Sequence, residues 1–318
     1  MINNSRLYFI HCLTSVHVGT GEGTGVIDMP IMREKMTAWP MLPGSSIKGV
    51  QREYHRRNDY NESWFNAAFG KEDNKKEATS VENAGHAGAL VLSDSRMLAF
   101  PVASRYGTFA YVSSPLAISR LLRDARAAGF EIPDELNWNK IDEVFQSADQ
   151  VIVGTDSVLR KPIQGDENKE TRFVELDEFK ATAKEEPSLT GWLNWLSKQL
   201  FDAEDPFSAK LLQERFVIVS DEAFQYFVTT CCEVTPRIRI ASETKTVEGG
   251  ALWYEEYIPT EAILYGLVWC DKIYAHGNNL TAETLLNKLS DEQLLQIGAN
   301  ASVGKGRVRF RFSGGDPS

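Results

Sequence analysis

The sequence lacks any long hydrophobic run. No apolar stretch in its 318 residues approaches the roughly 20 residues that a membrane-spanning helix needs. The amino-terminal residues MINNSRLYFIHCLTS also lack the basic and then apolar layout of a signal peptide. We therefore expect a globular, cytoplasmic protein with no membrane partner, and a hydrophobic content of 42% is enough for a substantial core.

Cysteines are few, and their spacing does not suit chemistry. Cys12, Cys231, Cys232 and Cys270 include no CxxC pair. Neighbouring residues on a strand point to opposite faces, so the adjacent pair cannot act together there. This pattern supports neither a zinc site nor a disulfide framework, and we expect buried free thiols.

Nucleotide-binding motifs are missing as well, although one glycine-rich stretch suggests them. Residues 19–34 read GTGEGTGVIDMPIMRE, and their glycines do not follow the GxGxxG spacing. Pro30 pushes Met29, the residue before it, out of the helical region, so the segment is expected to be extended and no helix begins there to hold a pyrophosphate. The segment PGSSIKG lacks the terminal GK[ST] of a Walker A loop. The glycines are therefore expected to form a loop between two extended segments.

An overall excess of basic residues is also absent, because the net charge is −10. Much of this acidity lies in residues 131–186, which hold 15 acidic and 7 basic residues, a net charge of −8. Local basic stretches remain at 33–57 and 298–312, so a polyanionic partner is still open. The shift in composition predicts an acidic, helical insertion over residues 131–213.

Hydrophobic patterns predict a mixed α+β fold with ferredoxin-like βαβ elements. Residues 235–259 alternate on both sides of a polar, glycine-containing turn, which predicts a long β-hairpin. Other segments are expected to form strands (LYFIHCLTSVHV, ERFVIVS, AILYGLVWCDKIYA and VRFRF) or helices (SPLAISRLLRDARAAGF, DEAFQYFVTT and, over 280–297, LTAETLLNKLSDEQLLQI).

Two glycine-and-lysine segments, PGSSIKGVQRE and GANASVGKGRVRF, have the features of anion sites. The first opens a predicted helix, whose free N–H groups and positive dipole end attract an anion. The second has glycines that let the backbone approach a ligand. The polar or charged residues concerned are Ser45, Ser46, Lys48 and Arg52 in the first segment, and Lys305 and Arg307 in the second. The alternatives are a capped helix and an ordinary turn, but together the segments favour an extended polyanion such as RNA.

A lone carboxylate lies beyond the glycine loop. Asp28 is the only acid between Glu22 and Glu34, and His17 lies just before the loop. A carboxylate near a scissile phosphate could hold a divalent ion or orient a 2′-hydroxyl, and a histidine could move a proton. A lone acid in a loop is more often a turn former, so the residues alone leave both interpretations open.

Four stretches in this order resemble the RAMP superfamily of CRISPR proteins, and specifically the backbone subunit of type III-B (Cmr) effector complexes. They are HVGTGEGTGVIDMPIMRE, LPGSSIKGVQRE, TPRIRIASETKTVEGGALWYEEYIP and GANASVGKGR. They span nearly the whole chain, and the acidic segment matches least. The resemblance implies a single RAMP domain over 1–318, with an RRM-like palm, a thumb-like β-hairpin and an inserted helical region.

The resemblance also implies partners and an activity in antiviral defence. Several copies would stack as a filament along a guide RNA, together with other Cmr subunits. A target RNA would pair with the guide, and each thumb would displace one nucleotide at regular intervals. The implied reaction is a metal-dependent attack of the 2′-hydroxyl on its adjacent phosphate, with Mg²⁺ or Mn²⁺ bound together with the RNA.

The family's functional residues can be placed by motif. The catalytic aspartate falls on Asp28, which could also hold the metal, and His17 matches a histidine of the same site. Glu255 and Tyr257 match a Glu-x-Tyr pair, with Tyr254 and Glu256 as the alternative register. The expected RNA contacts are Ser45, Ser46, Lys48, Arg52, Arg237, Arg239, Lys305 and Arg307.

Two alternatives of other classes stay open. One is a purely structural subunit that binds guide RNA without cutting. The other is a standalone nuclease that processes precursor guide RNA, with His17 or His11 as acid and base.

Overall fold

The computed structural model describes residues 5–23, 25–58, 60–71, 85–130, 132, 136–147, 149–162, 172–274, 280–289 and 292–313. The helices are α1 (Gly44–Asn58), α2 (Glu62–Phe69), α3 (Pro115–Ala127), α4 (Trp138–Val144), α5 (Pro187–Leu200), α6 (Pro206–Arg215), α7 (Asp221–Thr230), α8 (Ala282–Asn287) and the short 3-10 helix η2 (Ala301–Val303). The strands of the first half are β1 (Ser5–Cys12), β2 (Gly70–Lys71), β3 (His86–Ala87), β4 (Leu90–Leu92), β5 (Arg96–Ala103), β6 (Phe109–Ser113), β7 (Gln150–Val153) and β8 (Lys161–Pro162). Those of the second half are β9 (Arg172–Leu176), β10 (Phe179–Glu185), β11 (Phe216–Ile218), β12 (Glu233–Ile240), β13 (Val247–Tyr257), β14 (Ile263–Cys270), β15 (Gln293–Gln296) and β16 (Arg307–Phe312).

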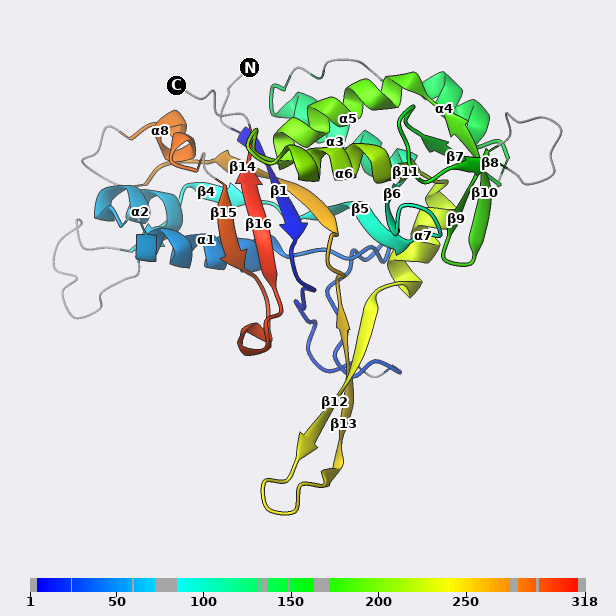
Figure 1. The fold of residues 1–318 in the computed structure, drawn as a ribbon. Coiled ribbons are helices and arrows are strands. Elements are labelled where there is room, and N and C mark those ends of the chain that lie inside the picture. Colours follow the sequence, from blue (N-terminus) through cyan, green and yellow to red (C-terminus); the bar gives the residue numbers. More distant parts are fainter. Residues whose placement is uncertain are drawn as a thin grey trace.

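One mixed sheet runs through the molecule, in the order β15-β16-β1-β14-β5-β6-β11-β7-β10-β9-β8, with β4 also paired to β14 (Figure 1). Around β1 the pairing is antiparallel, with β14 on one side and β16 on the other. Helix α1 lies in sequence between β1 and β4, and α8 lies between β14 and β16. The predicted mixed α+β class is confirmed.

Both faces of this sheet are covered by helices. In β1 the side chains alternate, so Leu7 and Phe9 join one hydrophobic core and Tyr8 and Ile10 join another. The first core contains residues of α3, α5 and α6, and the second contains residues of α1, α2, α7 and α8. The sheet is therefore a central layer, and ligands must approach at its edges or through the segments that project from it.

The segment 131–213 differs from the helical insertion that its composition suggested. It contains α4 and α5 and most of α6, but its strands β7, β9 and β10 also join the main sheet. The short apolar strand β7 pairs with β11 and with β10. These strands provide hydrogen-bond partners for its backbone, and a local sequence pattern does not reveal pairing with strands far away in the chain. The insertion is thus an extension of the sheet and is only partly helical.

Most of the other predicted elements are found, and one prediction was wrong. Helices α3 and α7 and the hairpin of β12 and β13 form where the patterns placed them. The predicted helix over 280–297, however, ends at Asn287 within α8, and β15 follows. In β15 the side chains of Gln293 and Leu295 are buried while Leu294 is exposed, so the pairing with β16 imposes a period of two.

The cysteines are unpaired, as expected. All four thiols are free, and those of Cys12, Cys232 and Cys270 are buried. Among the residues that the structure describes, no helix has the length and apolar character needed to cross a membrane.

Candidate functional site

The glycine loop and its flanks lie at the root of the projecting hairpin (Figure 1). The Met29 N–H donates to the Tyr254 carbonyl at 3.0 Å, and the Glu256 N–H donates to the Met29 carbonyl at 3.0 Å. Residues 28–31 therefore extend the hairpin root along the free edge of β13. Gly19 pairs with Ile31 in an antiparallel bridge, so the loop between them returns on itself. The two extended segments joined by glycines are present as expected.

Asp28 is exposed and is held by the backbone on both sides. Its Oδ2 accepts a hydrogen bond from the Tyr254 N–H at 2.7 Å, and its carbonyl accepts one from the Gly23 N–H at 2.7 Å. These contacts fix the carboxylate beside β13 while the side chain remains accessible to a ligand. Asp28 is thus both a turn former and an accessible acid.

A closed hydrogen-bond network surrounds Glu255 and Tyr257 on one face of the hairpin. Arg237 donates to Glu255 Oε2 at 3.1 Å and to the Tyr257 hydroxyl at 3.0 Å. Asn300 donates to the same two oxygens at 3.0 and 2.9 Å. The Tyr257 hydroxyl donates to Glu255 Oε2, and Trp253 Nε1 donates to Glu255 Oε1 at 2.9 Å. These five residues are called the Glu255 cluster below.

The centre of the Glu255 cluster is buried, and the cluster keeps the Glu255 carboxylate ionised. Glu255 is 7% exposed and Tyr257 is fully buried. Burial alone would raise the pKa of Glu255, but the hydrogen bonds from Tyr257, Trp253 and Arg237 outweigh it, so the pKa is lowered. Burial, and then the hydrogen bond to Glu255, raises the pKa of Tyr257. The pair is therefore a carboxylate and a neutral phenol near neutral pH.

His17 and Lys305 pack against the same tyrosine. The His17 ring lies 5.5 Å from the Tyr257 ring, and its Nδ1 is 2.7 Å from the Glu256 carbonyl. A carbonyl can only accept, so Nδ1 carries the proton and Nε2 of the neutral ring is the acceptor. Lys305 Nζ lies 4.7 Å from the centre of the Tyr257 ring and donates to Ser15 Oγ at 2.7 Å. His17 is 4% exposed, whereas Asp28 is open to solvent.

Glu256 faces the opposite side of the hairpin and has a structural partner. Its Oε1 accepts from Arg33 at 2.5 Å, and its Oε2 accepts from the Ile31 N–H at 3.0 Å. Arg33 also donates to the carbonyls of Ala38 and Val228, so it joins the loop to the end of α7. Glu255 and Tyr257 therefore belong to one polar cluster. Glu256, the glutamate of the alternative register, instead anchors the segment that follows the glycine loop.

His11 belongs to a different cluster from His17. Its Nε2 lies 2.8 Å from Glu261 Oε2, which also accepts from the Tyr111 hydroxyl at 2.6 Å. The His11 ring packs edge-on against Phe201. The two histidines have separate partners, so the structure does not present them as an acid and base pair.

The helix-opening motif PGSSIKG has partners within the protein. The Gly44 N–H at the start of α1 donates to the Asp94 carboxylate at 2.7 Å, and Lys48 Nζ donates to the Leu90 carbonyl at 2.7 Å. Burial, and then the nearby charge of Arg52, lowers the pKa of Lys48. Arg52 lies 5.8 Å from the Phe65 ring. Ser45 is exposed and Ser46 is half-buried.

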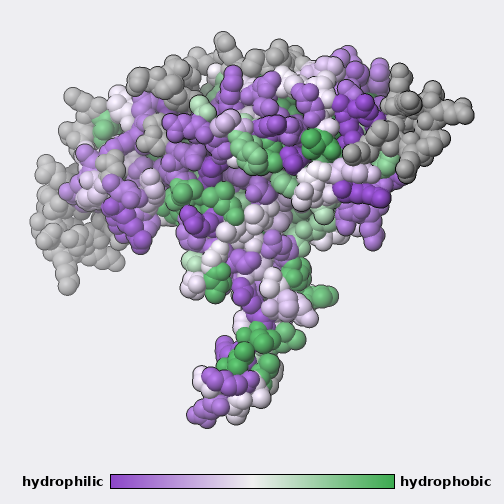
Figure 2. All heavy atoms as spheres, viewed as in Figure 1, coloured by the Kyte–Doolittle hydropathy of each residue, from purple (hydrophilic) through white to green (hydrophobic). Residues whose placement is uncertain are grey.

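The hairpin has two chemically different faces. Arg237 and Trp253 pair across one face, and Arg239 lies exposed further out on β12. The other face exposes apolar side chains, namely Val234, Ile238, Ile240, Val247, Leu252 and Tyr254. Figure 2 shows hydrophobic side chains along the projecting hairpin. Arg307 lies exposed at the start of β16, where its carbonyl accepts from the N–H groups of Leu13 and Thr14.

The residues at this site offer few ligands to a metal ion. Within the described ranges, no group of three or more His, Cys, Asp or Glu side chains could hold one. Both oxygens of Glu255 already accept hydrogen bonds from the protein. Asp28 is therefore the side chain here that fits a role as a metal ligand.

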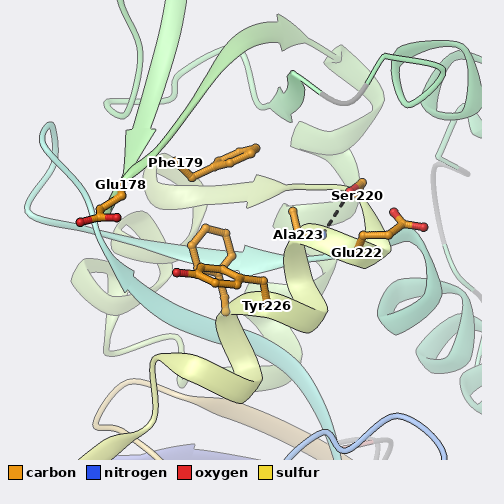
Figure 3. Close-up of a pocket in the computed structure, with 7 residues that line it drawn as sticks. Glu178, Phe179, Ser220, Glu222, Ala223 and Tyr226 are labelled. Carbon is orange, nitrogen blue, oxygen red and sulfur yellow. Dashed lines mark hydrogen bonds between the residues drawn. The ribbon is translucent and has the colours of Figure 1, made fainter.

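A groove of about 430 Å³ lies between α7 and the turn that joins β9 to β10. Figure 3 shows Phe179 facing Ala223 and Tyr226 across it, with Glu178 and Glu222 toward its two ends. An apolar lining flanked by two acids would repel a phosphate backbone. The lining of this groove therefore offers no basic side chain to a phosphate.

Two members of the Glu255 cluster, Trp253 and Asn300, were not among the predicted site residues. Trp253 could have been placed there because alternation along β13 sets it on the same face as Glu255 and Tyr257. Asn300 lies 45 positions from Glu255, and only the folded C-terminal loop brings the two together.

The structure therefore has a mixed sheet with helices on both faces and a projecting hairpin, with the accessible Asp28 at the hairpin root. The model of the RAMP superfamily matches residues 9–309, nearly the whole chain, and the chain belongs to this superfamily. It is 33% identical over 301 residues to the CRISPR system Cmr endoribonuclease Cmr4 of Pyrococcus furiosus, covering 94% of this chain and 92% of that protein. It therefore lies within the Cmr4 family.

Further relatives agree with this family. The CRISPR system CMR subunit Cmr4 of Saccharolobus solfataricus is 23% identical over 323 residues, covering 96% of this chain and 95% of that protein. The crystal structure of oligomeric Cmr4 from Pyrococcus furiosus superimposes with a TM-score of 0.65 and 26% identity, covering 98% of each chain.

Proposed function

We propose that this chain is the backbone subunit of a type III-B Cmr effector complex, in which it binds guide RNA and cuts complementary target RNA at regular intervals. Its similarity to a Cmr endoribonuclease over nearly the full length of both chains supports this role. The observation that carries it is the position of Asp28, an exposed carboxylate tied to the root of the hairpin by the Tyr254 N–H.

The strands around β1 form the RRM-like palm in this proposal. Their order β16-β1-β14, continued by β4 and β5, with α1 and α8 as the two connecting helices, is the ferredoxin-like arrangement. An RRM binds RNA on the open face of its sheet, but both faces of this sheet are covered by helices. The RNA is therefore placed along the hairpin root and the loops at the end of β1 and the start of β16.

The hairpin of β12 and β13 acts as the thumb. Its exposed apolar face provides side chains that can wedge between stacked bases, as apolar side chains do in other nucleic-acid complexes. A wedge at this point displaces one target nucleotide next to Asp28, which lies beside β13. Copies of the chain stacked along the guide then place such a thumb at constant intervals on the target.

The proposed cleavage is an internal transesterification of RNA. The 2′-oxygen loses its proton and forms a bond to the adjacent phosphorus, while the bond from phosphorus to the 5′-oxygen breaks and that oxygen takes up a proton. A-form stacking holds the 2′-hydroxyl away from the in-line direction, and displacing the nucleotide removes this constraint. Asp28 orients the hydroxyl with its carboxylate. Arg307, which is exposed at the start of β16, contacts the RNA backbone.

A divalent ion, Mg²⁺ or Mn²⁺, would supply charge neutralisation at the phosphate. Asp28 is the protein side chain that would hold it, with phosphate oxygens of the RNA and water as the other ligands. His17, Glu255 and Tyr257 are buried behind this point. Their contribution is to fix the hairpin root, and through it the position of Asp28.

The experiment that tests this function compares two carboxylates of the same loop. In the assembled complex, Asp28→Ala is expected to abolish cutting of the target while target binding stays intact. Glu22→Ala, which removes another exposed acid of the loop, should cut like the unmodified chain. Undiminished cutting by the Asp28 variant would contradict the proposal and leave a guide-binding scaffold, or a nuclease with another site.

A further inference from the structure

Asn300 has an unusual backbone conformation and an unusual use of its side chain. It lies at the amino-terminal end of η2 with φ of 64°, in the left-handed region. Asparagine is one of the few residues that adopt this region readily. An asparagine at such a position commonly caps the helix with its side chain, but here the side chain makes no capping hydrogen bond. The Asn300 amide instead donates hydrogen bonds to residues of the hairpin.

The amide of Asn300 is directed at Glu255 and Tyr257. Its Nδ2 lies 3.0 Å from Glu255 Oε2 and 2.9 Å from the Tyr257 hydroxyl, so each of its two hydrogens has an acceptor. The Tyr257 hydroxyl then accepts from Asn300 and Arg237 and donates to Glu255. The hydroxyl proton of Tyr257 and both amide protons of Asn300 therefore have acceptors within the cluster, which restrains the rotamers of these side chains.

The loop that carries Asn300 is fastened on both sides of it. Before it, the Ala299 N–H donates to the His17 carbonyl at 2.9 Å. After it, the Gly306 N–H donates to the Ser15 carbonyl at 2.9 Å, and Lys305 donates to Ser15 Oγ. The loop between β15 and β16 is thus tied to the segment that leads toward Asp28, and it contacts the hairpin through Asn300 and Lys305.

We propose that Asn300 is a positioning residue for target cleavage, holding the Glu255 and Tyr257 pair and with it the hairpin root beside Asp28. The proposal rests on the function proposed above. It assigns to Asn300 no contact with RNA, because its amide hydrogens are used by the protein. The loop that carries Lys305 and Arg307 is thereby linked to the hairpin root, and Lys305 adds a second contact by packing on the Tyr257 ring.

The test uses two substitutions that keep the left-handed backbone. Asn300→Gly removes the amide without backbone strain, and Asn300→Asp keeps the shape but places a carboxylate against Glu255. Asn300→Gly is expected to slow target cleavage by about tenfold to a hundredfold, the usual effect of losing a hydrogen-bonded support. Guide and target binding should stay within twofold of the unmodified complex, and Ser302→Ala, in the same loop, should cut normally.

A pH profile of cleavage separates positioning from a general structural role. In Asn300→Asp two carboxylates share one site, which raises the pKa of the pair. The acidic limb of the cleavage profile should therefore move to higher pH by about one unit. A general loss of structure would lower the rate at every pH without moving the limb.

The outcomes that contradict this proposal differ from those that contradict the function. If the unmodified complex cuts and Asn300→Gly cuts within twofold of it, or if the profile of Asn300→Asp does not move, Asn300 is not a positioning residue. Loss of guide binding in Asn300→Gly would place it in RNA binding and would also overturn the proposal. An unmodified complex that leaves the target intact would overturn the proposed function and this inference together.

Discussion

The buried ion pair between Arg33 and Glu256 is expected to hold the loop that carries Asp28. The carboxylate of Glu256 is 5% exposed and the Arg33 side chain 20% exposed, at a separation of 2.5 Å. Glu256 also accepts from the Ile31 N–H, three residues beyond Asp28. Replacing Glu256 by alanine leaves a mostly buried guanidinium without its counter-charge, which typically costs about 3–5 kcal/mol.

The magnitude should lie at the lower end of that range, because Arg33 keeps its bonds to the carbonyls of Ala38 and Val228. We expect Glu256→Ala to lower the free energy of unfolding in urea by about 3 kcal/mol. The matched control is Glu53→Ala, which removes an exposed ion pair with Arg57 on α1 and should cost less than about 1 kcal/mol.

The double variant Arg33→Met with Glu256→Ala sharpens this test. Removing both charges should recover part of the loss, because the cost arises mainly from the unpaired charge that the single variant leaves behind. If Glu256→Ala unfolds within about 1 kcal/mol of the unmodified protein, the pair does not anchor the loop. The account of how Asp28 is positioned would then be wrong.

Three further predictions concern the loop, the cluster and the RNA contact. Gly298→Ala should destabilise the protein by more than about 2 kcal/mol in urea unfolding, because the added Cβ would lie 2.1 Å from the His17 carbonyl. The control Gly304→Ala is also at positive φ but has nothing within 4 Å of the added Cβ, so it should cost about 1 kcal/mol. Equal losses in the two variants would exclude crowding as the cause. The pKa of Glu255 is below its ordinary value of about 4.3, so its ionised form stabilises the fold above about pH 4.3 and this contribution is lost on further acidification. Glu255→Gln should therefore lose less stability than the unmodified protein as the pH falls below about 4.3. An equal loss in both proteins would contradict this prediction. Arg307→Gln should reduce the slope of log guide affinity against log salt by about 0.7, measured by titration at several salt concentrations, and an unchanged slope would exclude a phosphate contact.

Local patterns predicted the parts of this fold that depend on local chemistry. The hairpin of β12 and β13 alternates polar and apolar residues around a glycine-containing turn, and α3 and α7 have apolar faces at helical spacing, so each could be predicted without its neighbours. The short strand β15 has the composition of a helix, and its pairing with β16 decided its conformation. Strands β7, β9 and β10 within the acidic segment were missed for the same reason.

The candidate site was predictable only in part. Alternation along one strand predicted that Glu255 and Tyr257 share one face. Asp28 was distinguished from an ordinary turn former only by the resemblance to the RAMP superfamily. The burial of His17 could not be predicted, because it follows from the C-terminal loop that packs over it. Asn300 and Lys305 reach Tyr257 from that same loop, and a contact between segments more than 40 residues apart leaves no periodic signal.

The central claim is that this chain cuts guide-paired RNA at a position set by its hairpin and Asp28. The most direct test is a cleavage map of end-labelled target RNA bound to the assembled complex, with divalent ion present and with the ion chelated. We predict cuts at constant spacing along the guide-paired region that require the ion and disappear in Asp28→Ala while the target stays bound. Cuts of irregular spacing, or the same regular cuts from the Asp28 variant, would contradict the account.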